Sequence, residues 1–398
     1  MVTPITNIYI VQQPNKTYPN RTATFMFDFS VEWEASDNWE DLTNQAKVTL
    51  PKNIYYTDQN GKKINLGNTI TGIGGFNGVP SFMRGDSVQI ISGYEYFQNG
   101  NKVIDTATIF TGYVSKVSSK KPFVLECEDN MWLLKQAPAK GGVNGVFSYK
   151  TYNVEDILRE LFKNAGLSFT VNALTTTNLG VDFRIDNNTI GQVIEKLRRE
   201  HYLKAYFRGN ELRCGSEVYI ESEAKTQKFV FQENIIEDDL EYNRKDDVVL
   251  SAIARSTNKV AKNVTTKDGH TKTKCEKLEV LVTFQNGEFF SQVKKPNDPL
   301  ALSTNNNGER REFYYNNITD PQVLIAEAKA QLMKYYYTGF RGNFTTFIVP
   351  FVKQGDNALI EDEILPERNG TYKIKSVKYK GGTEGMRQII GLDFKFNT

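Results

Sequence analysis

Histidine and cysteine most often perform nucleophilic or metal-assisted chemistry, and this 398-residue chain holds two histidines and three cysteines. His201 ends a predicted amphipathic helix, and His270 lies in a polar stretch beside Gly269. Neither histidine stands at zinc-ligand spacing from a cysteine or from the other histidine. Neither lies in a setting typical of a nucleophile–histidine–acid arrangement. The histidines therefore predict neither a metal site nor histidine catalysis.

The cysteines predict packing rather than reactivity. They are widely separated and odd in number, so at least one has no disulfide partner within the chain: Cys127, Cys214 and Cys275. The first of them lies on the apolar face of a predicted strand. Free cysteines in such positions are typical of buried small hydrophobic residues in a reduced compartment.

Glycine clusters give no sign of a phosphate or calcium site. Gly72–Gly75 and Gly381-Gly382 are not followed by Lys-Ser/Thr and open no helix after a strand, so they do not favour a phosphate cradle. Asp58–Gly61 lacks the terminal glutamate of a calcium loop and is typical of a turn. We expect no cofactor and no metal.

Carboxylates gather in three places that are typical of solvated turns: Glu126 with Glu128 and Asp129, Glu237 with Asp238 and Asp239, and Glu361 with Asp362 and Glu363. Glycoside hydrolysis uses two carboxylates on opposite sides of a cleft, and the sequence leaves that arrangement open. The run Tyr335–Tyr337 could stack sugars or bases, but its place between a helix and a strand is more typical of packing or an interface. We expect no enzymatic activity.

Charge and composition describe a soluble, β-rich protein. The 49 basic and 47 acidic residues give a net charge of +2, which argues against a wide surface that grips nucleic acid but allows a passage through which it slides. The 12% aromatic content favours β structure. We identify no secretory signal and no apolar run long enough to span a bilayer. A chain of this length predicts two to four domains.

The first segment reads as strands joined by tight turns. Ala23–Trp33 alternates so that one face of a single strand would carry Phe25, Phe27, Phe29, Val31 and Trp33. Asp58–Gly61 and Asn99-Gly100 are hairpin signals, and Ser81–Ile91 predicts a tight Gly-Asp turn that enters a strand. This pattern favours a barrel or a sandwich.

Ile109–Gln136 predicts a strand, a polar turn at Ser118–Lys121, a second strand and a short helix. Gly112 and Tyr113 lie in the first strand, on opposite faces. Asp129 stands at the N-cap position, ahead of Trp132 in the helix.

A compact α/β module follows. Its first helix is predicted to be capped by Asn153 and to end before Gly166, and its second to be capped near Asn188 or Thr189. A hairpin then turns at Arg208–Asn210.

Beyond Phe229 the β character returns, with a polar hairpin or loop expected at Ser256–Lys274 and a polar connection at Lys294–Glu309. A helix capped by Asp320 should bury Val323, Leu324, Ala328 and Leu332. The last predicted strands are Phe344–Phe351, Thr371–Lys380 and Arg387–Phe396. No internal repeat of fixed period is visible.

Four stretches in order resemble the bacteriophage tail hub, or baseplate hub, family, which also occurs in contractile injection systems. FTGYVSKV…PFVLECEDNMWLLK resembles the exit of the family's first barrel. YNVEDILRELFKNAGL and NNTIGQVIEKLRREHYLKAYFRGNELRCG resemble the helices and hairpin of its module. QGDNALIEDEILPERNGTYKIKSVKYKGGTEGMRQIIGLDFK resembles the last barrel, in which the matching residues are Gly355, Asp356, Gly370, Tyr372, Arg387 and Gln388.

The resemblance implies an α+β, mainly β fold with two β-barrel (tail-tube-like) domains. It divides the chain into a first barrel at residues 1–138, an α/β module at 139–228 and a second barrel at 229–398. A polar accessory insertion is expected around 256–315. Asn15–Asn20, Ser256–Lys274 and Lys294–Arg311 have no counterpart in the family pattern.

The resemblance also implies a structural role in the virion, after assembly in the host cytoplasm. The chain would form a homotrimeric ring with pseudo-six-fold symmetry, with a tail tube or distal tail protein above and spike, tip or fibre proteins below. Tape-measure protein or DNA would occupy the lumen without sequence-specific binding.

The residues expected to matter are architectural. Gly112, Gly355 and Gly370 would permit tight turns or close approach. Tyr372, Arg387 and Gln388 belong to the terminal hairpin, whose edge is expected to be exposed and to contact another subunit.

Two other functions stay open at the level of the sequence. One is a carbohydrate-binding or glycan-hydrolysing β protein, which needs a cleft with exposed aromatic residues and paired carboxylates. The other is an adhesin or pilus-like structural protein, which the missing export signal disfavours.

Overall fold

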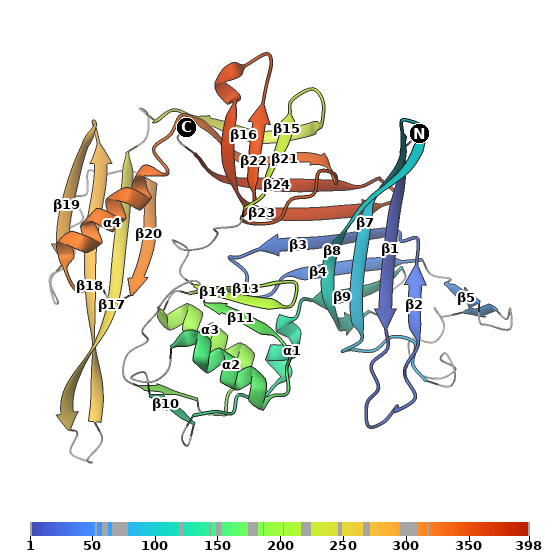
Figure 1. The fold of residues 1–398 in the computed structure, drawn as a ribbon, viewed down its shortest axis with the longest axis horizontal. Coiled ribbons are helices and arrows are strands. Elements are labelled where there is room, and N and C mark those ends of the chain that lie inside the picture. The colour runs from blue at the N-terminus through green and yellow to red at the C-terminus, as the bar shows by residue number, and fades with distance from the viewer. Residues whose placement is uncertain are drawn as a thin grey trace.

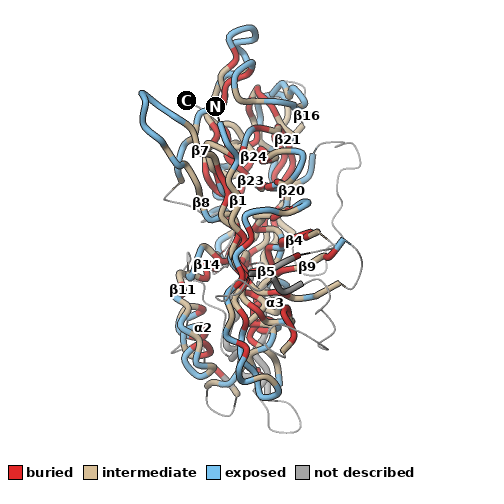
Figure 2. Tube along the Cα trace, turned by 90° about the vertical axis from the view of Figure 1, so that its right-hand side faces the viewer, coloured by how far each residue is buried: buried red, intermediate tan, exposed pale blue. Residues whose placement is uncertain are grey.

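The computed structural model is mainly β, as expected, with four α-helices in its described part (Figure 1). It describes residues 2–51, 54–57, 63–65, 79–118, 122–142, 145–148, 153–173, 182–185, 187–201, 203–215, 224–245, 249–265, 271–294, 309–316 and 318–396. In these residues no helix is both long and apolar enough to cross a membrane. Seen from the side, the molecule is narrow and elongated, and buried segments run through its whole length (Figure 2).

The first half-sheet has the strand order β3-β4-β9-β8-β7-β1-β2. Its strands are β1 (Val2–Val11), β2 (Thr24–Phe27), β3 (Glu32–Asn38), β4 (Gln45–Leu50), β7 (Ser87–Gln98), β8 (Asn101–Val117) and β9 (Phe123–Glu128). A separate small pair joins β5 (Tyr55–Thr57) to β6 (Lys63–Asn65), and its predicted turn at Asp58–Gly61 lies outside the described residues. The predicted turn between β7 and β8 is confirmed, because Asn99 and Gly100 have φ angles of 52° and 81°.

The single strand predicted at Ala23–Trp33 is wrong. The chain forms β2, leaves the sheet after Phe27 and re-enters it as β3 at Glu32. Phe29 and Val31, expected in the core, are 43% and 36% exposed. The alternation of apolar residues continues through a corner of the chain and so does not mark one strand. β2 pairs with β1 at one end of the half-sheet, and β3 pairs with β4 at the other.

The second half-sheet has the order β16-β21-β24-β23-β22-β15. Its strands are β15 (Thr226–Val230), β16 (Ile235–Asn243), β21 (Gly339–Phe347), β22 (Asn357–Glu361), β23 (Gly370–Gly382) and β24 (Arg387–Lys395), with a 3-10 turn η5 at Pro366–Arg368. The strand predicted at Phe344–Phe351 is β21, which both begins and ends earlier, at Gly339 and Phe347. It ends before Pro350, which has no N–H to donate to a ladder.

One ladder joins the two half-sheets. β23 pairs with β3 from Ser376↔Asn38 to Gly382↔Glu32, so the described strands form a continuous 13-stranded sheet. Figure 1 shows the two strands side by side at the centre of the molecule. A single apolar cluster draws on both halves, including Ile8, Trp33, Phe123, Phe229, Phe344 and Ile390. The two expected barrels therefore share both backbone hydrogen bonds and a core.

The α/β module packs around its own core. It contains α1 (Met131–Gln136), β10 (Val146–Ser148), α2 (Val154–Asn164), β11 (Thr170–Ala173), β12 (Asp182–Arg184), α3 (Ile190–His201), β13 (Lys204–Arg208) and β14 (Glu211–Gly215). Asn153 and Asp156 form the capping box of α2. Thr189 and Gln192 exchange the equivalent bonds at the start of α3, and Gly166 follows α2 with φ +69°.

The polar accessory region is a folded unit with its own core. β17 (Leu250–Thr265), β18 (Thr271–Gln285), β19 (Glu288–Lys294) and β20 (Glu309–Asn316) form a four-stranded sheet, and α4 (Pro321–Met333) packs on it. Ser256–Lys274 thus belongs largely to a long antiparallel pair. Asp320 caps α4 as predicted, but Val323 is 48% exposed and Ile325 takes the buried position expected for it.

Gly381 tests the ladder that joins the halves. A Cβ atom there would lie 2.4 Å from Cε2 of Trp33, whose ring is fully buried. We expect Gly381→Ala to lower the free energy of unfolding by about 1–3 kcal/mol, because the core must shift to admit the methyl group. Chemical denaturation measures the change. The exposed neighbour variant Glu384→Ala should be near neutral, and equal stabilities for the two variants would contradict the packing described.

Candidate functional site: the joint between the half-sheets

The same turn precedes β7 in the first half-sheet and β22 in the second. Gly85 and Gly355 have φ angles of +96° and +80°, and their N–H groups donate to the carbonyl oxygens of Val114 and Ile374, each at 2.8 Å. The aspartate that follows each glycine accepts a hydrogen bond from a backbone N–H three residues earlier. Asp86 accepts it at 2.7 Å. The equivalent bond to Asp356 measures 2.9 Å.

Strand order extends this equivalence. The order β3-β4-β9-β8-β7 in the first half matches β16-β21-β24-β23-β22 in the second. The register shifts directly after Val114 in one half and directly after Ile374 in the other. The next strand beyond this shared order differs, because β1 runs antiparallel to β7 whereas β15 runs parallel to β22. The molecule thus contains a structural repeat that the sequence does not show as a fixed period.

The equivalence reveals one missing pairing. β3 pairs with β4 on one side and with β23 on the other. Its counterpart β16 pairs with β21 on one side and, within the described residues, with no strand on the other. Four carboxylates are exposed along this free strand: Glu237, Asp238, Asp239 and Glu241. Free edges of this kind are ready-made sites for pairing with another chain.

An alternating row of charges crosses the joint on the face opposite the core. Directly opposed residues on five neighbouring strands read Lys380, Glu34, Lys47, Glu126 and Lys116. Lys378 also binds Glu34 at 2.9 Å, and Lys116 binds Glu126 at 2.9 Å. The hydrogen bond from Lys378 lowers the pKa of Glu34. Cross-strand pairs of opposite charge contribute roughly 0.2–1 kcal/mol each.

This face forms a shallow hollow of about 490 Å³, lined by Glu34, Lys47, Glu126, Glu128 and Lys378 among others. It carries no reactive group. Cys127 lies beneath it, but burial raises the pKa of its thiol and leaves it protonated. The described residues contain no group of three or more histidine, cysteine and acidic side chains that could hold a metal ion. The chemistry of the face is therefore that of a polar surface with balanced charge.

A buried carboxylate network lies beside the joint, where both halves meet the module. Asn44 connects its two acids: the backbone N–H donates to Asp129 at 3.1 Å, and Nδ2 donates to Asp37 at 3.2 Å. The N–H of Gln354, from the second half, donates to Asp37 at 3.2 Å. Burial raises the pKa of Asp37 to about 6 and that of Asp129 to about 7.

The hairpin of the module reaches the same place. Arg208 donates to the carbonyl oxygen of Gln354 at 3.1 Å and lies 3.6 Å from the carboxylate of Asp356. Asn130 donates to the carbonyl oxygen of Gly209 at 2.9 Å. These groups surround a polar cavity of about 190 Å³, so three parts of the fold are tied together at one point.

Asp129 was predicted to be the N-cap residue of α1, but it lies one residue before the N-cap. The N-cap residue is Asn130, whose side chain makes no capping bond. The Asp129 carboxylate instead accepts the N–H of Met131 at 2.9 Å from one position earlier. It is held there because its second oxygen accepts a hydrogen bond from Asn44. The predicted group therefore serves the helix start, but in a bond shared with the first half-sheet.

Gly112, Tyr113 and Trp132 lie where β8 approaches α1. A Cβ atom on Gly112 would lie 2.1 Å from the carbonyl oxygen of Glu128. Only glycine at this position therefore allows β8 to approach the end of β9 so closely. The rings of Tyr113 and Trp132 stack with centroids 5.4 Å apart, and Gly85 lies under the indole. These residues link the Gly-Asp turn of the first half to the module.

The terminal hairpin is not an edge of the sheet, so the exposed edge predicted for it is wrong. β24 lies between β21 and β23, and β23 itself pairs with β22, β24 and β3. Its predicted residues serve packing. Gln388 is buried and donates to the carbonyl oxygens of Phe347 and Pro350, and Arg387 lies over the ring of Phe347.

Gly370 and Tyr372 begin β23. A Cβ on Gly370 would meet the Lys395 side chain, and the buried hydroxyl of Tyr372 accepts the N–H of Phe340 at 3.2 Å. Gly370 therefore leaves room for the Lys395 side chain, and Tyr372 ties the start of β23 to β21.

Two of the acidic clusters lie in strands, the first of them in the second strand predicted within Ile109–Gln136. Glu126 and Glu128 lie in β9, and Glu237–Asp239 lie in β16. The signal that could have placed them is charge at every second residue, as in Glu32 and Glu34 or in Lys378 and Lys380, which indicates one face of a strand. Gly72–Gly75 and His270 lie outside the described residues.

The sequence also gave no sign of the buried pair between Arg21 and Asp86. Arg21 Nη2 lies 2.6 Å from Asp86 Oδ2, and both side chains are almost fully buried. The pair is missed because its partners lie 65 residues apart. It fixes the Gly-Asp turn of the first half-sheet.

Comparison with solved structures identifies the fold. A 43 kDa tail protein of prophage MuSo2 from Shewanella oneidensis is 10% identical, with a TM-score of 0.50 over 97% of this chain and 98% of that one. A tail protein from Neisseria meningitidis MC58 is 12% identical, with a TM-score of 0.51 over 99% and 96%. The chain has the fold of phage tail proteins.

This likeness covers nearly the whole chain and confirms, for the fold, the resemblance predicted from the sequence. No protein-family model matches the chain, and no curated protein matches it either.

The raised pKa of Asp129 makes the free energy of unfolding of this tail-protein fold depend on pH. A raised pKa in the folded state means that stability is greatest at acid pH and is lost as pH rises from the unfolded value near 4 through about 7. Asp129→Asn should flatten this loss, with a difference from the parent that reaches roughly 2 kcal/mol by pH 8. Urea denaturation between pH 5 and 8 measures it, and parallel pH profiles for the two proteins would refute the assignment.

The charged row makes a separate prediction. Lys47→Glu places three carboxylates side by side, with Glu34 and Glu126 on the two neighbouring strands. We expect a loss of roughly 0.5–1 kcal/mol beyond that of Lys47→Gln, because like charges directly opposite one another are destabilising. Added salt should reduce the difference. Equal denaturation midpoints for the two variants at low salt would show that the row has no electrostatic role.

Proposed function

We propose that this protein is a structural tail hub: three copies form a ring with pseudo-six-fold symmetry that joins the tail tube to the tip, spike or fibre components. The likeness to two tail proteins, one of them from a prophage, over nearly the whole chain supports a tail component. The ring, its partners and its place in the virion are the finer parts of the proposal.

The missing pairing of β16 carries the proposal. Within one chain, β3 of the first half pairs with β23 of the second. The counterparts of these strands are β16 and β8. Pairing β16 of one subunit with β8 of the next would repeat the same joint between chains. Three subunits would then supply six half-sheets and six similar joints, which closes the free edges into a ring.

The end of β8 is suited to this pairing. Ser376 begins the stretch of β23 that pairs with β3, and the register places Lys116 at the equivalent position of β8. Lys116 is exposed, and Lys120 and Lys121 follow it in the sequence. The free strand β16 is acidic. Opposite charges across the new joint would steer the subunits together and fix their register.

The alternating charged face is the proposed wall of the channel. It crosses the joint, so a ring built from repeated joints would present a continuous polar surface. A row of lysines and glutamates offers no wide basic patch to hold phosphates, which suits a lumen through which DNA or a tape-measure protein passes. A tail tube or distal tail protein would sit above this ring.

The role proposed is architectural and non-enzymatic. The alternative of a carbohydrate-binding or hydrolysing protein receives no support from the Tyr335–Tyr337 run. Tyr335 and Tyr337 are buried, and the ring of Tyr335 packs against Phe313 and Phe394. These side chains do not form an exposed platform for sugars.

Charge reversal on β16 tests the ring. The double variant Glu237→Lys, Asp239→Lys should stay folded, because both side chains are exposed. Its rings should be lost, or should require at least about tenfold more protein to form, which corresponds to roughly 1.4 kcal/mol. Mass photometry and negative-stain imaging measure the assembly. The control Glu327→Lys reverses an exposed charge on α4, away from the edge.

A parent chain that stays monomeric at high concentration, even beside tube protein, would overturn the proposal. Rings that form equally well with the double variant would instead place the subunit contact elsewhere.

A further inference from the structure

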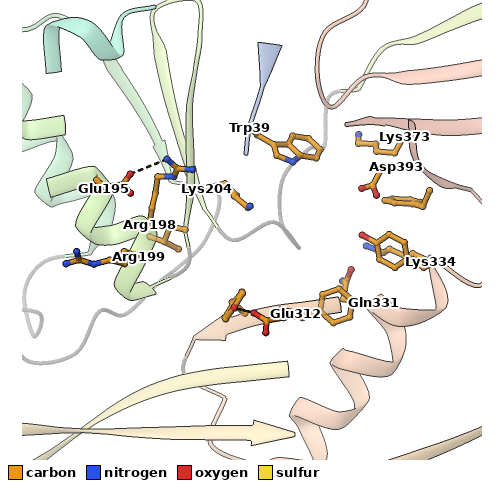
Figure 3. Close-up of a pocket in the computed structure, with 15 residues that line it drawn as sticks. Trp39, Glu195, Arg198, Arg199, Lys204, Glu312, Gln331, Lys334, Lys373 and Asp393 are labelled. Atoms are coloured by element: carbon orange, nitrogen blue, oxygen red, sulfur yellow. Dashed lines mark hydrogen bonds and ion pairs between the residues drawn. The ribbon is translucent and has the colours of Figure 1, made fainter. Parts of the chain in front are cut away.

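A cavity of about 430 Å³ lies where three units of the fold meet. One wall comes from α3 and β13 of the module, a second from β20 and α4 of the accessory unit, and a third from β23 and β24 of the second half-sheet. Trp39, from the loop after β3, completes the lining (Figure 3). No role described above uses this cavity.

Cations face one another across it. Figure 3 shows Arg198 and Lys204 on one side and Lys334 and Lys373 on the other. The ends of α3 and α4 account for the first and third of these, because cations near a helix C-terminus complement its dipole. Lys204 and Lys373 lie on strands, where that explanation does not apply. Including Arg199, five cations and three acids line the cavity.

The unused hydrogen-bonding capacity consists of donors. Trp39 is only 3% exposed, and its buried indole Nε1–H has no hydrogen-bond acceptor. Lys334 forms no ion pair within the described residues, its ammonium lies 5.8 Å from the centroid of the Phe394 ring, and burial lowers its pKa. A buried donor without an acceptor costs free energy, so a ligand that supplies oxygen atoms would relieve it.

Aromatic side chains supply the apolar part of the lining. Phe313 and Tyr335 stack with centroids 6.4 Å apart, and Tyr335 meets Phe394 edge-on at 5.8 Å. The cavity therefore combines separated cations, an unpaired donor and an aromatic wall. A ligand that fits must carry separated anionic groups on a partly apolar body.

We propose that this cavity binds an acidic peptide segment of a partner protein, with carboxylates on the cations of the two facing walls and an apolar side chain against the aromatic rings. Lys204 also pairs with Glu40, so five cations meet four acids and a positive excess remains that suits a carboxylate. A phosphate chain fits less well. The lining residues include no helix N-terminus and no glycine-rich loop, whose backbone N–H groups would hold phosphate oxygens.

The site is independent of the ring. It consists of residues from one chain, so a peptide would bind the monomer and the assembled protein alike. Because the accessory unit supplies one wall, an occupant would also hold that unit against the module and the second half-sheet.

The test uses the full chain and two fluorescein-labelled peptides, EDLFED and its amide counterpart QNLFQN. Fluorescence anisotropy should show that the acidic peptide binds at least about tenfold more tightly than the amide peptide. Lys334→Gln should weaken binding of the acidic peptide about tenfold, because a charge-assisted hydrogen bond is lost. Trp39→Phe removes the donor but keeps the ring system apolar, and should weaken binding severalfold.

Lys163→Gln is the matched control, because Lys163 is an exposed lysine on α2 that does not line the cavity. Thermal melting checks that each variant is folded, and Lys334→Gln alone decides if Trp39→Phe does not fold. The proposal fails if the acidic peptide binds no better than the amide peptide. It also fails if Lys334→Gln behaves like Lys163→Gln, or if a dT oligonucleotide binds at this site and the acidic peptide does not.

Discussion

The ladder between β3 and β23 is the constraint on which the rest of this structure depends. Without it, β3 and the end of β23 would each lose a pairing partner, and the apolar cluster that spans both halves would be split. The ladder is also closely packed, because Gly381 leaves room for the ring of Trp33. Backbone hydrogen bonds and a buried indole thus hold together segments more than 300 residues apart in sequence.

Both additional units enter the fold where they leave this ladder intact. The module follows β9, and the accessory unit lies between β16 and β21. Each has its own apolar core, so each could be added without repacking the central sheet. The module is joined to the two half-sheets through polar contacts. Asp37 and Asp129 are held in a buried network with raised pKa values, and Arg208 reaches across to the second half.

The distribution of charge follows the same division. On the open face of the sheet, opposite charges alternate between neighbouring strands, and each pair contributes little because water screens it. Beside the joint, the buried carboxylates interact much more strongly with their surroundings, because they have lost that water. Within the described residues, the strongest electrostatic interactions therefore lie where the parts of the fold meet, and the open face of the sheet carries balanced charge.

The sequence by itself determined the local elements. It predicted the caps at Asn153 and Asp320, the turn at Asn99-Gly100 and the hairpin at Arg208–Asn210, because each depends on a few neighbouring residues. It also supported the family resemblance through the order of such elements. Its errors occur where alternation continues through a corner, as at Phe29 and Val31, or where a helix face is chosen by a distant sheet, as at Val323 and Ile325.

Only the tertiary structure decided which strands are neighbours. It placed the terminal hairpin inside the sheet, left β16 at the edge and brought Lys380, Glu34 and Lys47 into one row. It also revealed the repeat of the two half-sheets, which share ladder positions and a Gly-Asp turn rather than a sequence period. Strand pairing across hundreds of residues uses backbone groups that every residue carries, so a local side-chain pattern does not reveal the partner strand.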